Sequence, residues 1–162
     1  MKIAVYPGSF DPFTAGHMDV LKRASDVADI VYAAILTNSA KKPVFSVEER
    51  MAIIEGAAKE LGLENVRTAT FDGLLVEFAK SIGARYIIRG LRAVTDFEYE
   101  FQIDAMNRRL APEIDTVYFM ANPEHSFLSS SMVKEVASYG GDISGLVPKE
   151  YEKLIAERLL KR

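Results

Sequence analysis

The stretch that decides the fold is IAVYPGSFDPFTAGH, residues 3–17. Its opening run, residues 3–6, is apolar and contains β-branched and aromatic side chains, which favour a β-strand. A loop with two glycines follows, and a helical pattern then covers residues 18–28. A helix that begins near His17 would direct free N–H groups and the positive end of its dipole at a bound phosphate. The stretch therefore predicts a strand, a ligand-binding loop and a helix in that order.

The alternation of strand and helix continues along the rest of the chain. Short runs rich in Val, Ile, Tyr and Phe predict four more strands, at 30–36, 66–70, 86–89 and 116–120. Helical patterns predict helices from a capping box at Ser46 to near Gly62, and at 74–82, 96–110 and 149–160. Such alternation is typical of parallel strands joined by right-handed crossovers. The sequence predicts an α/β fold: a Rossmann-like, doubly wound, five-stranded parallel sheet with helices on both faces.

Composition limits the classes of protein to consider. The 162 residues contain no linker-like stretch, so we expect one domain spanning 1–162. The absence of cysteine excludes disulfides, thiolate zinc sites and cysteine nucleophiles, and a net charge of -3 argues against a nucleic-acid-binding surface. The first residues form no apolar signal core, and the longest apolar run is far shorter than the roughly 20 residues that span a bilayer. We expect a cytoplasmic protein without membrane contact.

Ligands of such sheets bind beyond the carboxyl ends of the strands, so the loops after the strands are the candidates. The second of these loops contains Lys41 and Lys42, and the fourth contains Arg89 and Arg92 around Gly90. Arginine suits bidentate contact with phosphate oxygens, and a lysine ammonium can bridge two phosphates. The alternatives are solvated lysines, and arginines that pair with nearby acidic side chains, namely Asp96, Glu98 or Glu100.

The last of these loops contains three consecutive serines, Ser129, Ser130 and Ser131, before a helical pattern. One serine suffices for a helix N-cap, so the other hydroxyl and N–H groups could bind an anion. The alternative is an ordinary polar loop. Together, the four loops predict a phosphate-binding site at one edge of the sheet.

The first loop lacks both common phosphate-binding fingerprints, the P-loop and the dinucleotide-binding glycine pattern. Its residues Thr14-Ala15-Gly16-His17 instead resemble the [H/T]-x-G-H signature of the nucleotidylyltransferase superfamily. With the strings YPGSFDP (6–12), IRGLRAV (88–94), DFEYE (96–100) and SSSMVKEV (129–136), nearly the whole chain resembles the bacterial phosphopantetheine adenylyltransferase family. The resemblance implies transfer of an adenylyl group from ATP to 4'-phosphopantetheine with Mg²⁺, giving dephospho-coenzyme A and pyrophosphate.

The resemblance also implies the residues of the site. His17 would stabilise the transition state, with Lys41 and Arg92 as further catalytic cations. Phosphopantetheine would contact Ser9, Lys41, Leu75 and Arg89, with Leu74 as an alternative to Leu75. ATP would be surrounded by Ser9, Phe10, His17, Gly90, Leu91, Arg92, Glu100, His125, Ser126, Phe127, Leu128, Ser129, Ser130 and Ser131. His125 stands where relatives often carry Trp or Tyr. No side chain is assigned to a metal ion.

We expect direct in-line attack by the acceptor phosphate, because a phosphate monoester is already anionic and needs neither a base nor a covalent intermediate. The resemblance further implies a homohexamer and feedback binding of coenzyme A. Apolar residues on more than one face of the predicted helix 96–110 indicate either an interface or a deeply packed core helix. Two other functions stay open: a related nucleotidylyltransferase acting on nicotinamide mononucleotide or a polyol phosphate, and a nucleotide sensor without turnover.

Overall fold

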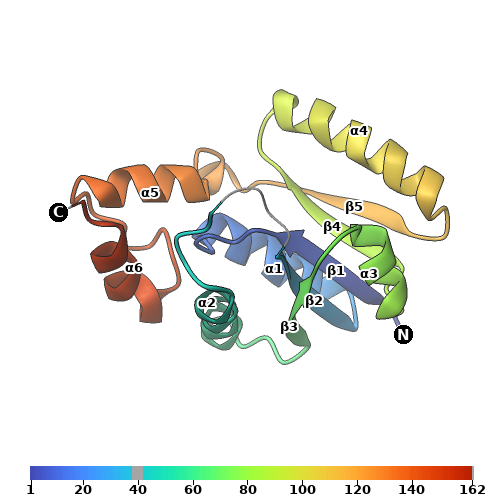
Figure 1. The fold of residues 1–162 in the computed structure, drawn as a ribbon, viewed down its shortest axis with the longest axis horizontal. Coiled ribbons are helices and arrows are strands. Elements are labelled where there is room, and N and C mark those ends of the chain that lie inside the picture. The colour runs from blue at the N-terminus through green and yellow to red at the C-terminus, as the bar shows by residue number, and fades with distance from the viewer. Residues whose placement is uncertain (38–41, 162) are drawn as a thin grey trace.

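A five-stranded parallel sheet forms the centre of the computed structural model, which describes residues 1–37 and 42–161 (Figure 1). The spatial order of the strands is β3-β2-β1-β4-β5, and each neighbouring pair is parallel. Their bounds are β1 Ile3–Gly8, β2 Ile30–Leu36, β3 Val66–Phe71, β4 Tyr86–Leu91 and β5 Asp115–Met120. This order confirms the predicted doubly wound α/β fold, and the strands differ from the predicted ranges by no more than two residues at either end.

Helices connect the strands in sequence order. They are α1 Ala15–Val27, α2 Val47–Glu60, α3 Leu75–Ser81, α4 Val94–Leu110, α5 Ser130–Ser138 and α6 Glu152–Leu159, with short 3₁₀ helices at Pro123–His125 and Lys149–Tyr151. The capping box predicted at Ser46 is present, because Ser46 and Glu49 exchange side chain to backbone hydrogen bonds. None of the helices in the described ranges is long and apolar enough to cross a membrane.

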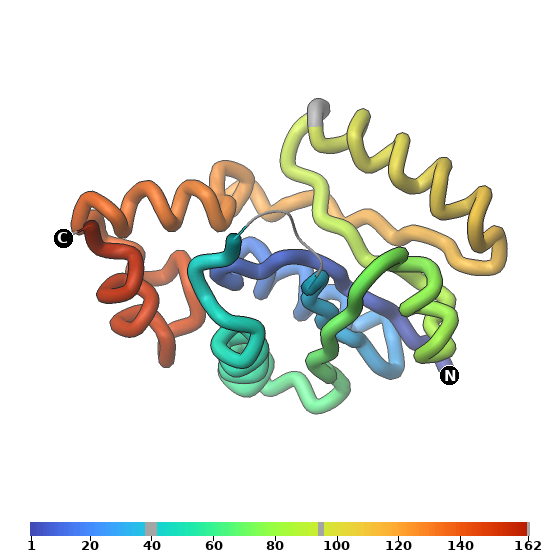
Figure 2. The backbone as a smooth tube through the Cα atoms, in the orientation of Figure 1, coloured from blue at the N-terminus to red at the C-terminus, as the bar shows by residue number. Residues whose placement is uncertain are grey.

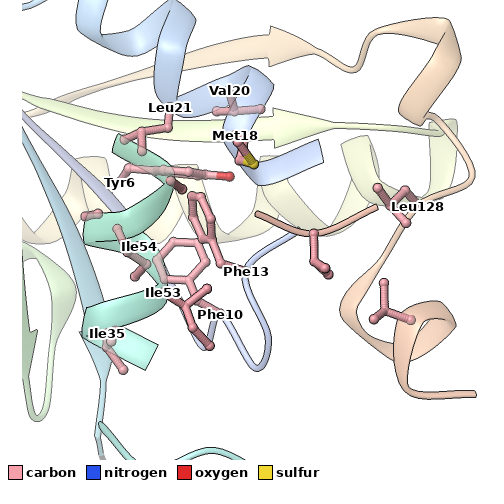
Figure 3. Close-up of a cluster of buried hydrophobic side chains, with 14 of the residues drawn as sticks. Tyr6, Phe10, Phe13, Met18, Val20, Leu21, Ile35, Ile53, Ile54 and Leu128 are labelled. Atoms are coloured by element: carbon pink, nitrogen blue, oxygen red, sulfur yellow. The ribbon is translucent and has the colours of Figure 1, made fainter. Parts of the chain in front are cut away.

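The larger part of the core covers one face of the sheet, beneath α1 and α2. Figure 3 shows Phe10 and Phe13 of the first loop packed between Tyr6 of β1 and the isoleucines of α2. The other face has a smaller core, in which Val76 and Ala79 of α3 pack near Val5 and Ile87. Helices therefore cover both faces, because side chains at successive strand positions point to opposite sides.

The C-terminal segment returns to the face that α2 covers. Figure 2 shows the chain after β5 crossing to that side, where α5 and α6 lie next to each other. Ile155 of α6 is completely buried, and Arg158 forms a two-pronged ion pair with Glu49 of α2. This packing holds the N-terminal end of α5 near the carboxyl ends of the strands.

Strands β1 and β4 pair over only two positions, Ala4 with Tyr86 and Val5 with Ile87. Beyond these positions the two strands separate, whereas β1 stays paired with β2 up to Gly8. The strand order reverses between β1 and β4, because the chain passes from β1 outward to β3 before it returns. Ligands of open α/β sheets bind at this kind of switch point.

Helix α4 does not form part of the buried core. Five of its large apolar side chains are exposed: Phe97, Tyr99, Phe101, Met106 and Leu110. Of the two alternatives for this helix, the deeply packed core helix is therefore wrong for these side chains. A row of apolar residues on a helix indicates burial against something, and in this chain the described residues do not cover it.

Candidate active site

A cavity of about 500 Å³ opens where β1 and β4 separate. Its walls come from the end of β1 and the first loop, the start of α1, the end of β4, α4, and the segment between β5 and α5. The predicted residues that line it are Ser9, Phe10, His17, Arg89, Gly90, Arg92, Glu100, His125, Leu128, Ser129 and Ser130. The fold thus brings together three chain segments that are far apart in the sequence, within 6–20, 89–100 and 121–130.

His17 lies in the first turn of α1, which begins three residues before the predicted helix start. Thr14 caps this helix, and the Thr14 backbone N–H donates to His17 Nδ1 at 3.0 Å. Because Nδ1 accepts this hydrogen bond, the proton of the neutral ring is on Nε2. Burial, together with the positive charge of Arg92, lowers the pKa of His17 to about 4. The ring is therefore neutral at physiological pH, with one N–H available to a ligand.

The imidazole is held between aromatic side chains. The Phe13 ring is stacked on it with ring centroids 5.2 Å apart, and the Phe10 ring meets it edge-on at the same separation. Phe10 and Phe13 are themselves buried. A ring that is packed on two sides and hydrogen-bonded at Nδ1 has little freedom to turn, so its Nε2–H has a fixed direction.

This arrangement has a consequence that NMR can measure. In a His125→Asn variant, which leaves one imidazole, we expect the His17 ring to stay in the Nε2–H form from about pH 8 down to about pH 5. An imidazole in the unfolded chain titrates near 6.5, so folding stability should fall as the pH drops from 6.5 to about 4. The ¹⁵N shifts of both ring nitrogens report this. A midpoint near 6.5, or a proton on Nδ1, would contradict the assignment.

The two arginines of β4 and its following loop are paired with acidic side chains of α4. Arg89 makes a two-pronged ion pair with Glu100, through Nε to Oε2 at 2.7 Å and Nη2 to Oε1 at 2.5 Å. Arg92 lies 3.5 Å from Asp96 and donates to the Leu128 carbonyl at 2.9 Å. The ion-pair alternative is therefore confirmed for both arginines. Both residues still line the cavity. Burial alone would lower the pKa of Arg89, but the hydrogen bonds and the charge of Glu100 raise it above its usual value.

The segment between β5 and α5 that ends in Ser129 to Ser131, here called the serine loop, contacts the first loop beside the cavity. Ser129 is the N-cap of α5 and accepts from the Met132 backbone N–H, as one serine of the three was expected to do. Ser130 Oγ donates to the Pro12 carbonyl at 2.8 Å. Leu91, Ser126, Phe127 and Ser131 do not line the cavity. The ATP contacts expected for these four residues, like those of the residues that do line it, stay predictions.

The residues predicted to contact phosphopantetheine line two neighbouring cavities that share Arg89. Ser9 lines the large cavity described above. Leu75, the first residue of α3, lines a much smaller cavity that it shares with Arg89 and Glu100. Leu74 precedes it and is 57% exposed. Lys41, predicted to contact phosphopantetheine and to act in catalysis, lies outside the described residues. Leu75 is thus the leucine that approaches Arg89.

Sequence reasoning gave no role to several residues that build the site. Tyr6 lines the cavity, and burial raises the pKa of its hydroxyl group well above the usual range. Arg50 of α2 is 4% exposed and donates to the Ser9 carbonyl at 2.9 Å. Asp11 is a buried carboxylate that pairs with Lys134. Tyr6, Asp11 and Lys134 stand in the sequence strings that carry the family resemblance, and this was the only sign of their importance. Arg50 lies outside those strings.

The acidic side chains at the cavity are already engaged. Asp19 pairs with Arg23, Asp96 with Arg92, and Glu100 with Arg89. Within residues 1–37 and 42–161, no three or more His, Asp or Glu side chains converge as a metal site would require.

The family model described as cytidylyltransferase-like matches residues 5–136, which include all of the cavity's walls. A phosphopantetheine adenylyltransferase of Lachnoclostridium phytofermentans is 52% identical over 98% of this chain and 96% of that protein. One from Caldanaerobacter subterraneus subsp. tengcongensis is 46% identical over 100% of this chain and 98% of that protein.

Solved structures share the fold at low identity. A putative nicotinate-nucleotide adenylyltransferase from Vibrio parahaemolyticus superimposes with a TM-score of 0.72 at 20% identity, over 100% of this chain and 97% of that one. A bifunctional NMN adenylyltransferase/ADP ribose pyrophosphatase from Francisella tularensis has a TM-score of 0.66 at 17% identity, over 98% of this chain and 52% of that one. The near-complete match to the curated relatives decides the family: the chain belongs to the phosphopantetheine adenylyltransferases, within the cytidylyltransferase-like proteins.

Proposed function

We propose that this protein transfers the adenylyl group of ATP to 4'-phosphopantetheine, giving dephospho-coenzyme A and pyrophosphate, the penultimate step of coenzyme A synthesis. The observation that carries the proposal is the neutral His17, whose Nδ1 is occupied by Thr14 and whose Nε2–H remains for a ligand at the cavity. A fixed donor of this kind suits a phosphate oxygen on which negative charge develops during transfer. Membership of the family supplies the identity of the acceptor.

The reaction would proceed by a single displacement. An oxygen of the acceptor phosphate attacks the α-phosphorus of ATP, and the bond from that phosphorus to the bridging oxygen of the β-phosphate breaks. Pyrophosphate leaves with the electron pair. Since the acceptor is a phosphate monoester that is already anionic near neutral pH, no general base has to deprotonate it. The enzyme's contribution is to place both substrates and to stabilise charge.

The positive groups would divide between the two substrates. Arg89, next to Leu75, would bind the acceptor phosphate, and Arg92, next to the serine loop, would bind ATP phosphates. Lys41 would bridge the two substrates from the second loop. Because the acidic side chains at the cavity are paired with arginines, Mg²⁺ would enter bound to ATP. There it would supply positive charge that neutralises the leaving pyrophosphate.

The test is an assay of pyrophosphate release with ATP, Mg²⁺ and one acceptor at a time. We expect the largest kcat/KM with 4'-phosphopantetheine, and little release with nicotinamide mononucleotide, nicotinate mononucleotide or glycerol phosphate. A preference for a mononucleotide or for the polyol phosphate would overturn the choice of acceptor. ATP binding without release for any acceptor would favour a sensor.

We further propose that the protein is a homo-oligomer, a hexamer by resemblance, located in the cytoplasm and subject to feedback binding by coenzyme A. The exposed apolar residues of α4 support a protein interface. Light scattering of the wild type should give six times the mass of one chain, and Phe101→Glu with Met106→Glu should lower that mass. A monomer at micromolar concentration would contradict the proposal.

A further inference from the structure

The carboxylate of Asp11 lies in the first loop and is almost completely buried, with its side chain 8% exposed. Three donors surround it: the Phe45 backbone N–H to Oδ1 at 2.9 Å, and the Val44 backbone N–H and Lys134 Nζ to Oδ2, both at 3.0 Å. A buried carboxylate is stable only when it is paired and hydrogen-bonded, and here both oxygens are. We call this group of four residues the Asp11 junction.

The four residues of the Asp11 junction come from three segments that lie beside the proposed site. Asp11 immediately follows Ser9 and Phe10, which line the cavity. Val44 and Phe45 lie just after the segment that contains Lys41 and just before α2. Lys134 is in α5, one turn beyond the serines of its N-terminal end. A single carboxylate therefore connects the first loop, the segment before α2 and helix α5.

The first loop needs such anchors because its backbone is strained. Phe10 has φ 48°, in the left-handed region that non-glycine residues rarely adopt. Two carbonyl groups of the loop accept hydrogen bonds from outside it: the Ser9 carbonyl from Arg50, and the Pro12 carbonyl from Ser130. Asp11 provides the third contact. It is the only one of these three contacts that reaches both the segment before α2 and helix α5.

We propose that Asp11 is a positioning residue for the transfer reaction: its carboxylate sets the spacing between the first loop, the start of α5 on the ATP side of the site, and the segment 42–45. Lys134 acts as the counter-ion of Asp11 and binds no substrate phosphate. The proposal rests on the proposed function, since it concerns how that reaction's two substrates are aligned. Misplacement of reacting groups by about 1 Å is enough to slow a reaction about 10²-fold.

The first test is Asp11→Asn, which keeps the size of the side chain but removes its charge. An amide has one acceptor oxygen, so it cannot serve all three donors. We expect kcat to fall about tenfold to a hundredfold and KM to rise for both substrates, while the folded protein persists in circular dichroism. The matched control is Asp26→Asn, which removes the charge of an exposed aspartate that pairs with Lys22. Its kinetics should equal those of the wild type.

The second test distinguishes positioning from a purely structural role. Lys134→Met should lower kcat in the same way, Lys134→Arg should restore most of it, and the double variant Asp11→Asn/Lys134→Met should lose less than the product of the two single losses. Lys153→Met, at an exposed lysine, is the control. A lower unfolding temperature with unchanged kcat and KM per folded molecule would overturn the proposal, as would equal losses in Lys134→Met and Lys134→Arg.

Calorimetric titration with ATP alone separates this proposal from the proposed function. We expect Asp11→Asn to bind ATP several-fold more weakly than the wild type, because the start of α5 is displaced, whereas Asp26→Asn binds it normally. A wild type that binds ATP but adenylylates no phosphopantetheine would refute the proposed function, and the ATP affinities would then decide the role of Asp11. An active wild type with unchanged ATP affinity and unchanged kinetics in Asp11→Asn would refute only the inference.

Discussion

His17→Ala should lower kcat by about 10²-fold or more, while the dissociation constant for ATP changes little. The reason is that a fixed hydrogen-bond donor at a developing negative charge acts mainly in the transition state, and removal of one such donor costs about this much. Steady-state kinetics and calorimetric titration with ATP measure the two quantities separately. Turnover within about twofold of the wild type would remove His17 from the mechanism.

His17→Ala also removes part of the N-terminal cap of α1, which lowers the stability of the fold. The unfolding free energy therefore has to be measured together with the activity. The His17 ring accepts from the Thr14 N–H, and a lost cap costs about 1 kcal/mol. His17→Gln provides the comparison, because its amide can donate a hydrogen bond but lacks the packing of the imidazole between Phe10 and Phe13. We expect activity between those of the wild type and the alanine variant. An inactive His17→Ala protein that has also unfolded would be no support for the mechanism.

Arg89→Ala should raise KM for 4'-phosphopantetheine about tenfold to a hundredfold and affect KM for ATP much less. A hydrogen bond to a charged group contributes about 1.5–3 kcal/mol, and the contact would be present in the bound ground state as well as in the transition state. Arg89→Lys should recover only part of the loss, since an ammonium group cannot make the two-pronged contact. An unchanged KM for the acceptor in Arg89→Ala would contradict the assignment.

Arg89 also neutralises Glu100, which is 8% exposed, so the alanine variant leaves a mostly buried carboxylate without its partner. The variant Arg89→Ala/Glu100→Gln removes both charges and separates this effect from substrate binding. We expect the double variant to regain stability in chemical denaturation but not to regain affinity for the acceptor. Recovery of both would mean that Arg89 acts only through Glu100.

The parts of the fold that depend on local sequence could be predicted. β-Branched and aromatic runs bounded by turn residues gave all five strands, and the capping box at Ser46 gave the start of α2. The start of α1 was placed too late because Thr14 is followed at the third position by His17 instead of Glu or Gln. A histidine that caps through its ring nitrogen has no established sequence signature, although it fixes the tautomer at the centre of the site.

The parts that depend on distant partners could not be predicted. Arg50 reaches Ser9 across 41 positions, and Asp11 reaches Lys134 across 123. The loop arginines illustrate the same limit: a strand-end Arg89 favours a phosphate contact but also suits an ion pair, and Glu100 is only one of three candidate partners. Periodicity likewise could not separate a core helix from an interface helix at α4, because both are apolar.

The proposed mechanism is direct transfer between two substrates that meet at His17, without an enzyme-bound intermediate. It is tested most directly with one diastereomer of ATP that carries sulfur on the α-phosphorus, reacted with 4'-phosphopantetheine and Mg²⁺. A single in-line displacement predicts a dephospho-coenzyme A analogue in which the configuration at phosphorus is inverted, as ³¹P NMR can determine. Retention of configuration would require two displacements and a covalent enzyme intermediate, and would refute direct transfer.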